Sequence, residues 1–69
     1  MIRLNKIEKF QLFCLENYRA SKNMPGKKVL REFENKAVFN FLAKGYEVLH
    51  TQGVLYIVAE INDYLERRK

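Results

Sequence analysis

The two residue types that most readily supply a nucleophile and its base occur once each, as Cys14 and His50. A thiolate activated by an imidazole is a common arrangement for covalent catalysis. Cys14, however, falls within an apolar stripe at helical spacing, where a thiol acts as a small hydrophobic side chain. His50 falls in the last turn of a predicted helix, where its ring can cover the end of a core. We therefore expect structural roles for both residues.

Other chemistries have few candidate groups. One Cys and one His cannot complete a structural zinc site without carboxylates. The carboxylate pairs Glu32/Glu34 and Glu60/Asp63 fall on polar helix faces, with no apolar pocket to raise the pKa of one member. The three glycines are isolated in the sequence, so no phosphate-binding loop is present. The sequence predicts no metal, no cofactor, no catalytic residue and no enzymatic activity.

Length and composition indicate one small soluble domain spanning residues 1–69. The chain has 69 residues, of which 48% are hydrophobic and 30% charged, as expected for a packed domain. Thirteen Lys and Arg against eight Asp and Glu give a formal net charge of +5, which favours an acidic partner such as nucleic acid or a protein surface. No apolar run is long enough for a signal peptide or a membrane span. We expect a cytoplasmic location.

Hydrophobic periodicity predicts an all-α domain. Four helices are expected, over about residues 5–22, 25–35, 37–51 and 54–67. Asn5, followed by Glu8 three positions later, resembles a capping box at the start of the first helix. A break is expected near Asn35 and Lys36, because the apolar direction turns sharply there and Asn suits a left-handed terminal residue.

The third predicted helix is apolar over most of its circumference, so we expect it at the centre of the core. Gly53 is expected to end it as a left-handed residue. The side chains expected to be buried there, with Ile57 and Ile61 packed on them, are Val38, Phe39, Leu42, Tyr46 and Leu49.

A β-hairpin over residues 46–58 is the alternative to the last two helices. Residues 46–50 and 55–58 are rich in strand formers and flank a turn at Thr51-Gln52-Gly53. Such a hairpin would give a winged-helix-like fold. The helix is favoured, because apolar spacing near a period of about 3.6 residues continues beyond the ambiguous segment.

Some apolar residues project away from the predicted core stripes and are candidates for binding a partner. They are Leu12, Phe41, Val48, Leu55 and Tyr56. Phe41 and Val48 are expected to form a second apolar line on the third predicted helix. Tyr56 is the expected anchor of an interface, because aromatic residues dominate interface energetics.

Basic residues form a second candidate surface. Lys27, Lys28 and Arg31 lie together on the outer face of the second predicted helix. With the third helix this unit has helix-turn-helix proportions, but a helix that forms the core cannot also read a DNA groove. Nucleic-acid binding is therefore the alternative to protein binding.

Most of the chain also carries a family resemblance, in residues 13–18, 26–33, 46–53 and 56–65. Its most specific piece is Tyr46-Glu47-Val48-Leu49-His50-Thr51-Gln52-Gly53. These segments resemble a family of small bacterial proteins of similar length with a domain-of-unknown-function label, often encoded beside ADP-ribosyltransferase-like toxins. The resemblance supplies no catalytic residue. It implies an antitoxin-like or accessory component of a toxin–antitoxin or defence locus.

We therefore expect a small non-catalytic protein-binding module. Its partner would be an adjacent toxin-type enzyme or a second copy of the chain. A basic nucleic-acid-binding regulator of helix-turn-helix type is the alternative.

Overall fold

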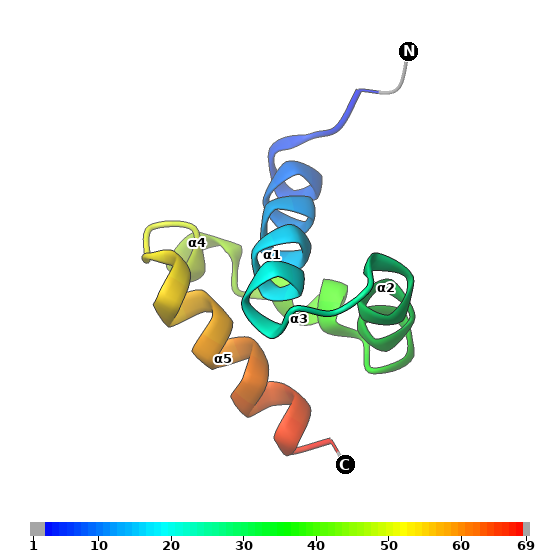
Figure 1. Ribbon diagram of the computed structural model, residues 1–69. Helices are drawn as coiled ribbons and strands as arrows, with labels where there is room; N and C mark the ends of the chain where they lie inside the picture. The colour runs from blue at the N-terminus through cyan, green and yellow to red at the C-terminus, as the bar shows by residue number, and fades with distance from the viewer. Residues whose placement is uncertain (1–2, 69) are drawn as a thin grey trace.

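A computed structural model of the protein describes residues 3–68 and consists of helices joined by short turns (Figure 1). The helices are α1 (Lys6–Lys22), α2 (Gly26–Asn35), α3 (Val38–Lys44), α4 (Tyr46–Leu49) and α5 (Val54–Glu66). The described part of the chain contains no strand, so the predicted all-α class is confirmed. The hairpin alternative over residues 46–58 is wrong, because its second half is the start of a regular helix, α5.

The N-terminus of α1 is fixed by the predicted capping box. The Asn5 side-chain oxygen accepts a hydrogen bond from the Glu8 backbone N–H at 2.8 Å, and the Asn5 backbone N–H donates to Glu8 Oε1 at 2.9 Å. Each side chain thereby satisfies a backbone donor that the first helical turn leaves unpaired. The helix ends at Asn23, whose φ of 53° is left-handed.

The predicted third helix, 37–51, is divided at Gly45 into α3 and α4. The Gly45 N–H still donates to the Phe41 carbonyl at 3.0 Å, so the chain turns without losing this bond. A Cβ atom placed on Gly45 would lie 2.9 Å from Leu49 Cδ1, closer than real side chains approach. Glycine therefore lets Leu49 fold back over the junction.

Gly53 is not the left-handed residue that we expected. Its φ of −75° and ψ of 163° are extended, and it precedes α5 as the N-cap. The left-handed residue at a predicted break is instead Ala37, with φ of 57°, in the turn between α2 and α3. The expected break near Asn35 and Lys36 is thus confirmed, with its left-handed residue one or two positions later.

Helices α1 and α3 share the centre of the fold. Each packs against α2 and α5 as well as against the other, and in Figure 1 α2 and α5 lie on opposite sides of α1. The buried side chains form one cluster: Phe10, Cys14, Leu15, Tyr18, Val29, Phe33, Val38, Leu42, Leu49, Ile57, Val58 and Ile61.

The predicted central residues are mostly in this core. Val38 and Leu42 are fully buried and Leu49 is nearly so, and the expected Ile57 and Ile61 pack with them. Phe39 and Tyr46 are only partly buried. Both lie at the edge of the core. The Phe39 ring meets the Phe33 ring edge-on, with ring centroids 5.5 Å apart, and the Tyr46 ring meets the Phe10 ring edge-on, with centroids 5.4 Å apart.

Candidate functional site

Cys14 lies in the core, with 1% of its surface exposed. Burial raises the pKa of its thiol to about 12, so the thiolate is scarcely populated at neutral pH. The position agrees with the prediction that this residue acts as a small apolar side chain.

His50 directly follows α4 and is exposed. Its ring stacks on the Tyr46 ring, with centroids 4.3 Å apart and an interplanar angle of 4°. His50 Nδ1 lies 2.6 Å from the Tyr46 carbonyl oxygen. A carbonyl oxygen can only accept, so Nδ1 carries the proton in this contact. His50 therefore covers Tyr46 at the edge of the core, the kind of structural role expected from the sequence.

The carboxylate pairs remain at the surface. Glu34 and Asp63 are exposed, and Asp63 forms a salt bridge with Arg67 at 2.9 Å. Glu32 and Glu60 are partly buried. Residues 3–68 hold no group of three or more His, Cys, Asp or Glu side chains placed to bind a metal ion.

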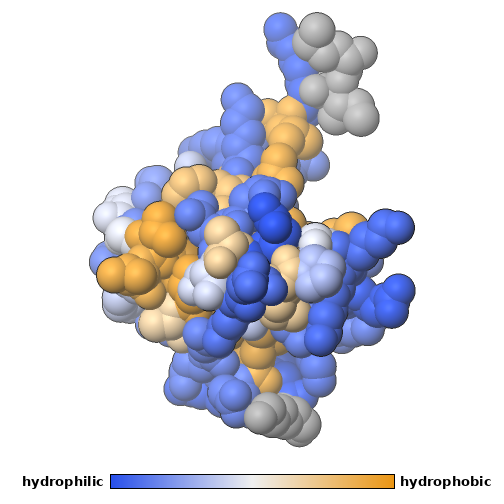
Figure 2. All heavy atoms as spheres, viewed as in Figure 1, coloured by the Kyte–Doolittle hydropathy of each residue, from blue (hydrophilic) through white to orange (hydrophobic). Residues whose placement is uncertain are grey.

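Apolar side chains are exposed where α4 and α5 meet. We call this set the corner patch: Val48 (63% exposed), Val54 (38%), Leu55 (87%) and Tyr56 (46%). Figure 2 shows hydrophobic residues gathered on the side of the molecule where α5 begins. A hydrogen bond with Glu60 raises the pKa of the Tyr56 hydroxyl and ties this side chain to the next helical turn. Three of the predicted partner-binding residues, Val48, Leu55 and Tyr56, therefore lie exposed on α4 and on the first turn of α5.

Leu12 lies elsewhere, on an apolar groove between α1 and α2. The groove has a volume of about 620 Å³, and Leu4, Leu12 and Leu30 are its most exposed apolar residues. On one wall, Gln11 Nε2 donates a hydrogen bond to the Phe39 carbonyl at 2.8 Å, which joins α1 to α3. Leu12 and the corner patch thus lie on different helices and form separate surfaces.

The projection of one continuous helix predicted a shared apolar line for Phe41 and Val48. In the structure Phe41 lies on α3 and Val48 on α4. The Phe41 ring stacks on that of Tyr64, with centroids 4.3 Å apart and an interplanar angle of 24°, and Phe41 is partly buried. The break at Gly45 separates the two residues into different helices, so the angular projection no longer applies between them.

The basic residues predicted on the second helix are all exposed. Lys27, Lys28 and Arg31 lie on α2 and form no salt bridge with other described residues.

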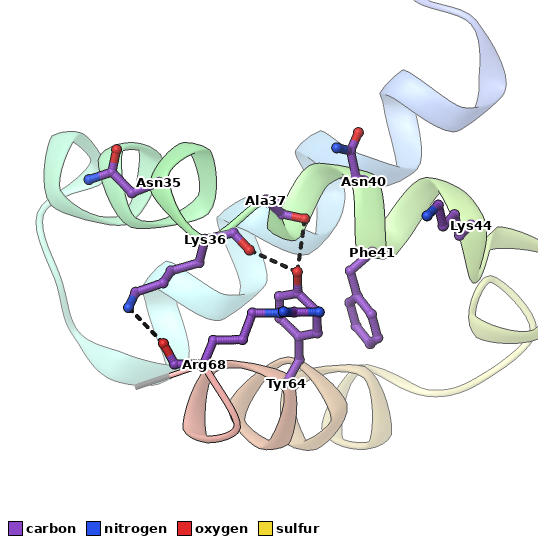
Figure 3. A pocket seen from close by; sticks show the side chains of 8 residues that line it. All are labelled: Asn35, Lys36, Ala37, Asn40, Phe41, Lys44, Tyr64 and Arg68. Carbon is purple, nitrogen blue, oxygen red and sulfur yellow. Dashed lines mark hydrogen bonds between the residues drawn. The ribbon is translucent and has the colours of Figure 1, made fainter.

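A second basic feature is a cavity that we call the basic hollow (Figure 3). It has a volume of about 690 Å³ and lies between the end of α2, the length of α3 and the end of α5. The cations around it are Lys36, Lys44 and Arg68, and the amides of Asn35 and Asn40 complete its polar lining.

An aromatic wall holds the basic hollow together. The Tyr64 hydroxyl donates to the Lys36 carbonyl at 2.8 Å, and it also lies 3.3 Å from the Ala37 carbonyl. The Arg68 guanidinium lies 4.5 Å from the centre of the Tyr64 ring, within the range of a cation–π contact. Lys36 Nζ donates to the Arg68 carbonyl at 3.0 Å. These contacts fix the C-terminal end of α5 against the turn between α2 and α3.

Comparison with known families identifies the chain. A family model described as "Protein of unknown function (DUF3791)" matches residues 9–68. The chain belongs to the DUF3791 family. No curated protein and no solved structure matches this DUF3791 chain. The family match confirms the predicted resemblance to a domain of unknown function.

Sequence reasoning missed the basic hollow of this DUF3791 protein. Two signals were visible, the helix break near Asn35 and Lys36 and the basic run at residues 67–69. Nothing in the local pattern shows that these segments meet, because Lys36 and Arg68 are 32 positions apart. In the described part of this DUF3791 chain, no helix has the length and apolar character needed to cross a membrane.

Proposed function

We propose that this DUF3791 protein is a non-catalytic module that binds another protein through the corner patch. The observation that carries the proposal is the exposure of Leu55, 87% of whose surface is accessible beside the half-exposed Tyr56. Burying a leucine side chain that was exposed gains about 1.5–3 kcal/mol, so a complementary partner surface would gain stability here. Aromatic residues are frequent anchors at the centre of interfaces.

The partner that we propose is a toxin-type enzyme encoded beside this protein. The support is the resemblance to a family whose members often lie beside ADP-ribosyltransferase-like toxins. In this proposal the chain is an antitoxin-like or accessory component that acts in the cytoplasm. Its net charge of +5 would favour encounter with an acidic surface of the enzyme.

Co-expression with the product of the adjacent gene tests this proposal. Wild type, Leu55→Gln and Tyr56→Ala are compared by co-purification and by size-exclusion chromatography. We expect capture by wild type and loss of capture in both variants, because removing an interface anchor costs about 2 kcal/mol or more of binding energy. Lys9→Ala truncates another exposed side chain, on α1, and is the matched control.

Two results would contradict the proposal. One is a wild-type monomer that captures no neighbouring gene product. The other is capture that persists unchanged in both corner-patch variants. Self-association that depends on Leu55 and Tyr56 would keep the corner patch as an interface, with a second copy as its occupant.

Nucleic-acid binding is the second candidate function, favoured by the exposure of Lys27, Lys28 and Arg31 on one helix. Against it, α3 contributes Val38 and Leu42 to the core and so has few side chains free to read a groove. A gel-shift series over salt concentration distinguishes the two functions, since phosphate contacts weaken steeply with salt. Tight, sequence-dependent binding at physiological salt, lost when these three residues are neutralised, would favour this second function.

A further inference from the structure

The basic hollow concentrates positive charge from segments far apart in the chain. Lys36 follows α2, Lys44 ends α3 and Arg68 follows α5, and all three side chains line one cavity. Neither of the salt bridges that the described residues form with one another, Glu16–Arg19 and Asp63–Arg67, involves these cations. A group of like charges around one cavity attracts an anion, because a bound anion relieves their mutual repulsion.

The hollow is built before any ligand arrives. The Tyr64 hydroxyl holds the α2–α3 turn through the Lys36 carbonyl, and the Phe41 ring stacks on the Tyr64 ring. The contact of Arg68 with the Tyr64 ring limits the orientations of its guanidinium. A restrained guanidinium loses less conformational freedom on binding an oxyanion, and its planar fork matches the two oxygens of a carboxylate.

The lining favours an acidic protein segment over a continuous nucleic-acid backbone. No carboxylate lines the basic hollow itself, and Asn40 adds an amide donor beside Lys44. Directly beside it lies a second cavity that shares Phe41, Tyr64 and Arg68 but is also lined by Glu60 and Asp63. A nucleic-acid backbone continuing across this boundary would meet those two carboxylates. A protein segment can place acidic side chains in the hollow and turn others away from Glu60 and Asp63, because its charges are on flexible side chains and not on its backbone.

We propose that the basic hollow binds a carboxylate-bearing segment, rich in Asp or Glu, on the protein partner. This inference rests on the proposed protein-binding function and adds the chemistry by which the partner is recognised. Arg68 and Lys44 contact the carboxylate, and Asn40 donates a further hydrogen bond. The partly buried Phe41, which also lines the hollow, provides apolar contact beside the charged group.

Binding of a labelled hexa-glutamate peptide to the full chain, followed by fluorescence anisotropy, tests the inference without the partner. A hexa-glutamine peptide of the same length is the neutral comparison. We expect the glutamate peptide to bind and the glutamine peptide not to. The double variant Lys44→Gln/Arg68→Gln should weaken binding by at least about tenfold, the loss expected for one charge-assisted hydrogen bond.

The matched control is Lys27→Gln/Arg31→Gln on α2, which removes the same net charge from another exposed surface. We expect this control to keep most of the affinity. Asn40→Asp is a second hollow variant that places a carboxylate in the hollow at an exposed position, and it should also weaken binding. Thermal melts of all variants check that each remains folded.

Three results would overturn the inference. The first is that the glutamate peptide does not bind. The second is that both double variants lower the affinity for this peptide equally. The third is that a single-stranded oligonucleotide of equal charge binds the hollow more tightly than the peptide does. Failure of the proposed function is separate, because that test measures capture through Leu55 and Tyr56. Retained capture with no peptide binding refutes the hollow alone, and peptide binding with no capture refutes the corner-patch interface alone.

Discussion

The Tyr64 hydroxyl, near the end of α5, donates a hydrogen bond to the carbonyl oxygen of Lys36 at 2.8 Å. The two residues are 28 positions apart, so this bond ties α5 to the turn between α2 and α3. A turn carbonyl without this donor would depend on water for its partner. The bond is therefore a long-range stabilising contact as well as one wall of the basic hollow.

Tyr64→Phe removes this hydrogen bond and keeps the ring. We expect the free energy of unfolding to fall by about 0.5–1.5 kcal/mol, the usual net value of one such bond. Denaturant titration followed by circular dichroism measures the change. Tyr56→Phe is the control, since it also removes a tyrosine hydrogen bond, the one with Glu60, but on a half-exposed side chain where water can replace it, so its unfolding midpoint should move less. Equal loss in the two variants would show that the Lys36 contact does not stabilise the fold.

Leu42→Ala tests the central position of α3. Leu42 is fully buried, so its truncation leaves a cavity and should cost about 2–5 kcal/mol, a large part of the stability of a small domain. Leu55→Ala, the same substitution at an exposed position, should change stability by less than about 0.5 kcal/mol. Thermal unfolding of both variants checks this contrast. An unchanged melting temperature for Leu42→Ala would remove α3 from the centre of the core.

The sequence predicts the local features of this fold well, because they depend on neighbouring residues. The capping box at Asn5 and Glu8 needs only a spacing of three, and the apolar stripes of α1, α2 and α5 follow from helical periodicity. The exposure of Leu55 and Tyr56 also follows from their angular positions on a regular helix.

Features that depend on tertiary packing were not predictable in the same way. A single glycine is tolerated within a helix, so the sequence does not show that Gly45 divides the third helix until Leu49 is seen folding against it. Residue preference likewise pointed to Asn35 and Gly53 for left-handed positions, whereas tertiary packing places Ala37 there. The basic hollow depends on contacts across 28 and 32 positions, which no local pattern contains.

Gly45→Ala tests the requirement for close approach at the α3–α4 junction. The added methyl group would lie 2.9 Å from Leu49 Cδ1 and 3.3 Å from the Phe41 carbonyl oxygen, so the end of the Leu49 side chain must shift and the Phe41 carbonyl must give way slightly. We expect a loss of about 1–3 kcal/mol, typical of overpacking. Gly53→Ala is the control, because a Cβ there meets no atom within 4 Å and the backbone is extended. A Gly45→Ala protein as stable as wild type would contradict this account of the break.

The buried thiol of Cys14 is expected to make the folded protein less stable at high pH. Burial raises the pKa of its thiol from 9.0 to about 12. Between these values the unfolded chain loses the thiol proton and the folded chain keeps it, so stability falls as pH rises through this range, by up to about 1.4 kcal/mol per pH unit. Below pH 9 both states hold the proton and this contribution is fully present.

Unfolding free energies of wild type and Cys14→Ala, measured from pH 7 to 11, isolate this effect. Cys14→Ala should be less stable at pH 7, because of its cavity, but should lose less stability as pH rises. Burial also raises the pKa of Tyr18, which contributes in both proteins and cancels in the comparison. Parallel pH profiles for the two proteins would show that the pKa of the Cys14 thiol is no higher in the folded state than in the unfolded state.

Replacing alanine by glycine is expected to change the stability of the protein in opposite directions at Ala37 and at Ala59. Ala37 has a left-handed φ of 57°, a conformation that costs an alanine about 1–2 kcal/mol and costs glycine little. Ala59 is exposed within α5, where glycine costs about 1 kcal/mol through the entropy of the unfolded chain. Ala37→Gly should therefore stabilise the protein by about 0.5–1 kcal/mol, because relief of strain exceeds the entropic cost. Ala59→Gly should destabilise it by a similar amount. Paired denaturant titrations would show midpoints displaced to opposite sides of wild type, and a loss of stability in both variants would mean that Ala37 carries no strain.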